Sequence, residues 1–88
     1  EPWITLANNK FLIKADAQVY AIERLDDIDL SEYPADTVLD LLQTVLAEKI
    51  YTNTMWENDK FILKAYRFDE DGLKDVILVL KSLDQIKF

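Results

Sequence analysis

An eight-residue stretch of this chain occurs twice, fifty residues apart. Residues 8–15 read NNKFLIKA and residues 58–65 read NDKFILKA, so five of the eight positions are identical. A weaker similarity, between residues 25–30 and 83–88, has an offset of fifty-eight, so a strict duplication would need an insertion in the second half. Because self-similarity at such a period usually marks a supersecondary unit used twice, we expect two pseudo-repeat halves, about 1–50 and 51–88.

The length of the chain limits it to one domain. With 88 residues, 50% of them apolar and 31% charged, residues 1–88 can form the single small core of a globular protein. The longest uninterrupted apolar run, 76–80, is far too short to span a membrane. Since the chain begins with Glu1 in place of Met, we expect a processed chain or an excised domain. The lack of Cys fits either a reducing or an oxidising compartment, so it does not give the location of the protein. We slightly favour the cytoplasm.

The absence of both Cys and His excludes most catalytic chemistry. It removes thiolate nucleophiles, the commonest general base near neutral pH, and the usual zinc and copper ligands. The 17 acidic residues offer many carboxylate pairs, but no spacing selects one of them, and glycine-rich phosphate loops are absent from the sequence. We therefore predict that the protein is not an enzyme and uses neither a cofactor nor a bound metal.

The net charge of −7 bears on the choice of partner. A negative field repels phosphate backbones and anionic membrane surfaces, so it argues against nucleic acid and membranes as partners. It favours a basic protein partner, or it simply keeps the domain in solution.

The first half is predicted to begin with a β-hairpin. Residues 3–6 are rich in strand formers, and residues 8–9 are an Asn pair, which tolerates the positive φ of a tight turn. The return strand then alternates, which places Phe11 and Ile13 on one face.

The second half repeats this pattern. Residues 51–56 are strand-like, the turn falls at 58–59, and residues 60–68 form the return strand. Residues 18–25 follow the first hairpin and fit either a strand or a helix, and we interpret them as a further strand.

Residues 35–50 have the periodicity of an amphipathic helix, with Pro34 in its first turn. Its apolar residues occupy positions 38, 39, 41, 42, 45, 46 and 50. This apolar arc is wider than one small sheet face normally covers. Either the helix is sandwiched within the core, or part of it contacts another chain.

Residues 69–86 fit two different structures. A helix would place apolar residues on one face and the acidic residues 69–71 at its start, where the helix dipole favours them. Alternatively, residues 76–80 form a buried strand, and residues 71–72 close a hairpin. We favour the helix, which leaves Leu78 exposed on its polar side.

Together these elements predict an α+β fold. It consists of an antiparallel sheet built from two hairpin-then-helix (ββα-like) units, with two helices packed on one face of the sheet.

Four lysines occupy matching positions in the two copies of the repeat and project from the outer face of this sheet. They are Lys10, Lys14, Lys60 and Lys64. Leu12 and Ile62 lie between the members of each pair, and Tyr66 continues the face in the second copy. This surface is a candidate for binding a nucleic-acid backbone or an acidic peptide, although lysines also mark the solvated face of many sheets.

A second candidate surface is an acidic loop before the helix at 35–50. Its carboxylates are Asp26, Asp27 and Asp29. Asp27, Asp29 and Ser31 match the first alternating ligands of a calcium-binding loop, but Glu32 stands where Gly is needed and Val38 where the bidentate Glu is needed. We therefore assign no metal and keep the three carboxylates as partner-binding candidates.

These observations favour a non-catalytic protein–protein interaction module, such as an adaptor, an inhibitor or an assembly domain, whose partner is another protein or a second copy. One alternative is a domain that faces nucleic acid through the lysines. A less favoured alternative is a carboxylate-based metal-binding or enzymatic domain.

Overall fold

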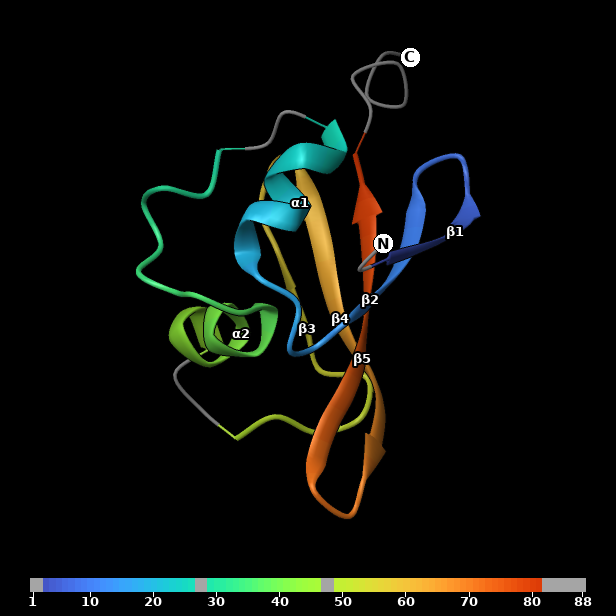
Figure 1. Ribbon diagram of the computed structural model, residues 1–88, viewed down its shortest axis with the longest axis vertical. Helices are drawn as coiled ribbons and strands as arrows, with labels where there is room; N and C mark the ends of the chain where they lie inside the picture. The colour runs from blue at the N-terminus through green and yellow to red at the C-terminus, as the bar shows by residue number, and fades with distance from the viewer. Residues whose placement is uncertain (1–2, 27–28, 47–48, 82–88) are drawn as a thin grey trace.

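The computed structural model describes residues 3–26, 29–46 and 49–81, with the side chain of Asp26 left out. Seven elements follow one another along the chain (Figure 1). They are β1 (Trp3–Ala7), β2 (Lys10–Lys14), α1 (Val19–Asp26), α2 (Val38–Leu46), β3 (Met55–Glu57), β4 (Phe61–Asp69) and β5 (Gly72–Leu80).

The five strands form one antiparallel sheet in the order β1-β2-β5-β4-β3. The last strand, β5, is therefore the central one and separates the two hairpins. Its neighbours, β2 and β4, are the strands that carry the two copies of the repeat. Phe11 in β2 is paired with Leu78 of β5, and Leu63 in β4 is paired with the same residue from the other side.

Both helices lie on the same side of the sheet (Figure 1). The core between the two layers contains Phe11, Ile13, Phe61, Leu63, Val76 and Leu78 from the sheet and Ile22, Val38, Leu41 and Leu42 from the helices. The strand residues alternate with residues that point to the opposite face, as a pleated strand requires. The structure thus confirms the predicted α+β fold with an antiparallel sheet and two helices. The prediction of one hairpin-then-helix unit in each half is wrong for the described residues, because both helices follow the first hairpin and β5 follows the second.

Both predicted hairpins are present, β1–β2 and β3–β4. Among the described residues other than glycine, only Asn53 has a positive φ, so the turn at Asn8 and Asn9 forms without a left-handed residue. The side chain of Asn9 instead donates a hydrogen bond of 2.9 Å to the carbonyl of Leu80, which ties this turn to the end of β5.

The prediction of a strand at residues 18–25 is wrong, because this segment is α1. A strand would place Tyr20 and Ile22 on the same face, whereas Tyr20 is exposed and Ile22 is completely buried. Val19, Ile22 and Leu25 contact the core instead, and their spacing of three is that of a helix.

The helix predicted at 69–86 is also wrong for the residues that the structure describes, which end at Lys81. Residues 72–80 are β5, joined to β4 by a turn at residues 70–71, and Leu78 is buried where the helix would have exposed it. The central strand is apolar on both faces, so its sequence shows no alternation and mimics a helical stripe. The second helix of the fold is therefore α1, and the acidic residues 69–71 belong to a hairpin.

The helix predicted at 35–50 is shorter, because α2 spans Val38–Leu46. It begins after Thr37, whose hydroxyl accepts a hydrogen bond from the Asp40 amide at 3.1 Å, as an N-cap residue does, so Pro34 precedes the helix. All the apolar side chains of α2 are buried in or packed against the core. The core thus accounts for most of the wide apolar arc, but Leu39, Val45 and Leu46 are only partly buried, so a contact of this helix with another chain stays a prediction.

Gly72 has a φ of 121°, a conformation that residues with a side chain rarely adopt. A Cβ at this position would have no atom within 4 Å, so a substitution would meet strain but no collision. We expect Gly72→Ala to lower the free energy of unfolding by about 1–2 kcal/mol. Urea denaturation followed by circular dichroism measures this, and an unchanged midpoint would contradict the assigned turn.

Candidate functional site: the outer face of the sheet

Two rows of paired residues cross the sheet on the face opposite the helices. The first row passes through all five strands and consists of Ile4, Leu12, Ile77, Lys64 and Met55. The second crosses β2, β5, β4 and β3 and consists of Lys10, Val79, Ile62 and Glu57. We call the surface made by these rows, with Leu6 and Tyr66, the outer face.

The outer face contains a shallow hollow of about 340 Å³. Its lining residues are Leu6, Lys10, Leu12, Met55, Ile62, Lys64, Tyr66, Ile77 and Val79. All of them come from strands, and no helix among the described residues covers them. An antiparallel sheet with one solvated face normally carries polar residues there, so this apolar surface is unusual.

The apolar residues of the outer face differ in how far they are covered. Ile77 lies in the central strand and is only 6% exposed, whereas Leu6, Met55 and Tyr66 are about half exposed, at 48%, 53% and 51%. The hollow therefore has a sheltered apolar floor and an open apolar rim.

The structure brings together only some of the predicted site residues. Lys10, Lys64 and Tyr66 line the same hollow. Lys14 lies further along β2, where its Nζ is 3.6 Å from Oδ1 of Asp75. Lys60 precedes β4 and is absent from the lining of this hollow.

Two carboxylates of the described strands, those of Glu57 and Asp75, already have cationic partners. Glu57 accepts a hydrogen bond from Lys81, and Asp75 contacts Lys14 and Arg67. Within residues 3–26, 29–46 and 49–81, no ion pair is found for Lys10 or Lys64. The hollow thus has an excess of positive charge in a chain whose net charge is −7.

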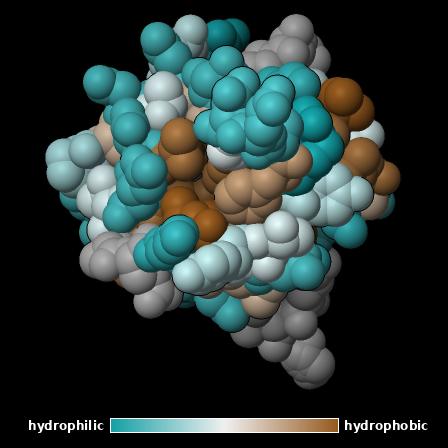
Figure 2. Space-filling model, turned by 90° about the horizontal axis from the view of Figure 1, so that it is seen from below, coloured by the Kyte–Doolittle hydropathy of each residue, from teal (hydrophilic) through white to brown (hydrophobic). Residues whose placement is uncertain are grey.

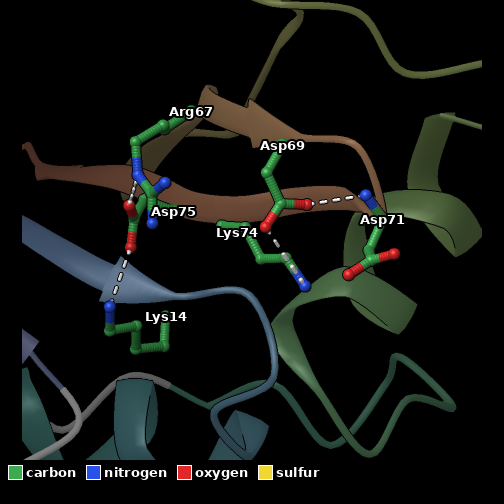
Figure 3. A network of polar contacts seen from close by, with 6 residues as sticks. All are labelled: Lys14, Arg67, Asp69, Asp71, Lys74 and Asp75. Atoms are coloured by element: carbon green, nitrogen blue, oxygen red, sulfur yellow. Dashed lines mark hydrogen bonds and ion pairs between the residues drawn. The ribbon is translucent and has the colours of Figure 1, made fainter.

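Asp75 is the central member of a charged group that spans three strands (Figure 3). Its side chain is 6% exposed, and its Oδ2 accepts a hydrogen bond from Nε of Arg67. Beyond this group, Lys74 lies 3.8 Å from Asp69, which also accepts a hydrogen bond of 2.7 Å from the Asp71 amide. These contacts fix the charges at the turn end of the β4–β5 hairpin.

A larger hollow of about 810 Å³ lies where this hairpin approaches α2. Figure 2, which views the molecule from below, shows hydrophobic surface set among hydrophilic side chains at this end. Its lining includes the apolar Leu39, Ile50, Phe68 and Leu73 and the charged Lys14, Asp16, Lys49, Arg67, Asp71 and Lys74. Because its charged residues are of both signs, and Asp71, Lys14, Arg67 and Lys74 lie in or beside the ion pairs described above, we assign no class of ligand to this hollow.

The acidic loop has a structural role where the structure describes it. The Ser31 amide donates a hydrogen bond of 2.9 Å to Oδ1 of Asp29. Hydrogen bonds from the side chain and the backbone of Ser31 hold the pKa of Asp29 below its ordinary value, and the charge of Lys60 adds a smaller attraction. Asp27 and the side chain of Asp26 lie outside the described residues, so their predicted role stays a prediction.

No three Asp or Glu side chains of the described segments gather closely enough to hold a metal ion. In the same segments, no helix is both long and apolar enough to cross a membrane.

The sequence did not predict the apolar residues that β1, β3 and β5 add to the outer face. Residues such as Leu6, Met55 and Val79 come from three strands that are distant in sequence, and only the strand order places them around Lys10 and Lys64. The alternation within β2 and β4 was a usable signal, because it already put Leu12 and Ile62 on the lysine side.

The fold is shared with a class of solved structures, the transporter-associated domains. The CorC-associated region from Neisseria meningitidis MC58 has a TM-score of 0.80 at 15% identity, over 92% of this chain and 100% of that one. A hemolysin domain from Enterococcus faecalis V583 has a TM-score of 0.80 at 17% identity, over 93% and 100%. The CorC_HlyC transporter-associated domain of a Xylella fastidiosa Temecula1 hemolysin, solved with Mg²⁺ and Mn²⁺, has a TM-score of 0.76 at 8% identity, over 93% and 100%.

Identities this low show a common fold and nothing more specific. No family model matches the chain, and no curated protein matches its sequence.

Proposed function

We propose that this chain is a non-catalytic interaction module that docks its outer face on a protein partner. The observation that carries the proposal is the apolar surface across all five strands, which no described helix covers. A contiguous exposed apolar patch rimmed by polar residues is typical of a protein interaction site. The fold it shares with transporter-associated domains favours a partner that belongs to a transport protein.

The composition supports a role without catalysis. The chain lacks the residues that most often act as general bases and nucleophiles, His and Cys. Among the described residues, the hollow on the outer face is lined by apolar side chains, one Tyr and two Lys, with no carboxylate. It therefore offers a surface for binding and no acid–base pair.

The arrangement of the lysines favours a protein over nucleic acid. A nucleic-acid backbone is normally held by a continuous positive groove with exposed aromatic rings for stacking. Here Lys14 is paired with Asp75, and Lys10 and Lys64 are separated by apolar side chains. The surface thus resembles a protein interface, in which charged residues lie around an apolar core.

Affinity capture from nuclease-treated lysate of the source organism tests this function. We expect the double variant Leu6→Glu/Met55→Glu to capture at least about tenfold less of the partner protein than the original chain does, since a charge buried in an apolar interface is costly. The matched control, Tyr20→Glu/Tyr51→Glu, replaces residues of similar exposure, 54% and 62%, outside the hollow, and should retain it. Equal capture by both variants, or partners that depend on nucleic acid, would overturn the proposal.

A further inference from the structure

We infer that the partner segment bound by the outer face is amphipathic and acidic. In this arrangement an apolar side chain of the partner fills the hollow, and two of its carboxylates pair with Lys10 and Lys64. This inference rests on the proposed function and specifies the chemistry of the partner.

The hollow suits a small number of apolar side chains. Its volume of about 340 Å³ is at the lower end of the range of about 300–1,000 Å³ found for small-molecule sites. Ile77 and Val79 of the central strand contribute to the floor, and Leu6, Met55 and Tyr66 to the open rim. A cavity of this kind accepts the buried anchor of a peptide, the part of an interface that supplies most of the affinity.

The two lysines define where negative charge is needed. Lys10 is paired with Val79 and Lys64 with Ile77, so they lie on opposite sides of β5 and two residues apart along it. Strand spacings of about 4.8 Å and a rise of about 3.4 Å per residue place their Cα atoms about 12 Å apart. That separation corresponds to about four residues of an extended peptide or about eight residues of a helix.

The charges of the outer face disfavour the other occupants. A second copy packed face to face would bring lysines of both chains together, and like charges in an interface are costly. An anionic membrane would attract Lys10 and Lys64 but repel the rest of a chain whose net charge is −7. An acidic segment satisfies both lysines and still buries the apolar residues between them.

Selection from a random peptide display library on the immobilised chain tests this inference. We expect enriched peptides with an apolar anchor and two carboxylates at one of these spacings, and amide NMR shifts at Leu12, Ile62 and Val79 when they bind. In the variant Lys10→Glu/Lys64→Glu, their affinity should fall at least about tenfold, and repeated selection should enrich basic peptides. The control Arg24→Glu/Lys49→Glu changes the net charge equally, through residues outside the hollow, and should still select acidic peptides.

The outcomes separate the two proposals. Peptides that bind at the outer face without any preference for carboxylates would overturn this inference and leave the proposed function in place. Peptides that bind only elsewhere would contradict both. Two further results would also overturn it. One is a dimer in sedimentation equilibrium that becomes more stable in Lys10→Glu/Lys64→Glu. The other is binding to vesicles containing phosphatidylserine that is lost in the same variant.

Discussion

Replacing Leu78 by Ala is expected to lower the free energy of unfolding by about 2–5 kcal/mol. Leu78 is completely buried in the central strand, where its two cross-strand partners are Phe11 and Leu63. Truncation would leave a cavity between the sheet and the helices, and the strands on both sides limit how far it can collapse. Urea denaturation followed by tryptophan fluorescence measures the loss, and Leu78→Val is the milder variant if the Ala variant does not fold.

Leu6→Ala is the matched control for this prediction. Leu6 has the same side chain but is 48% exposed on the outer face, so its truncation should cost within about 0.5 kcal/mol. The comparison also tests the location of the last strand, because a helix over residues 69–86 would expose Leu78. Similar small losses in both variants would show that the segment is not a buried strand.

The hairpins could be predicted because their signals are local. In each copy of the repeat, a turn of Asn or Asp residues precedes an alternating strand, and Phe11 and Phe61 are both buried as that alternation requires. The same alternation placed Lys10 and Lys64 on the opposite face. These parts of the fold and of the candidate site follow from short stretches of sequence.

The remaining parts depend on the order of the strands. The central strand β5 is apolar at the consecutive positions 76–80, so its period cannot distinguish it from a helix. Its insertion between β2 and β4 pairs residues more than sixty positions apart in sequence, such as Leu12 and Ile77. The hollow exists only because of this pairing, so its apolar lining could not be deduced from either hairpin alone.

Replacing Arg67 by Met is expected to lower the free energy of unfolding by about 2–3 kcal/mol. Asp75 is 6% exposed and lies between Arg67 and Lys14 on neighbouring strands. Removing one partner of a fully buried ion pair costs about 3–5 kcal/mol, because an unpaired charge is left behind. The expected loss is smaller here, since Arg67 is half exposed and Lys14 remains 3.6 Å from the carboxylate.

Adding Asp75→Val to Arg67→Met should recover most of that stability, to within about 1 kcal/mol of the original chain, because an apolar residue in a central strand needs no ionic partner. The control is Lys74→Met, which removes the more exposed contact with Asp69 at 3.8 Å and should cost at most about 0.5 kcal/mol. Chemical denaturation of the original chain, Arg67→Met, Asp75→Val and the double variant gives the coupling between Arg67 and Asp75 from a double-mutant cycle. A coupling near zero would mean that the ion pair between Arg67 and Asp75 does not contribute to the stability of the fold.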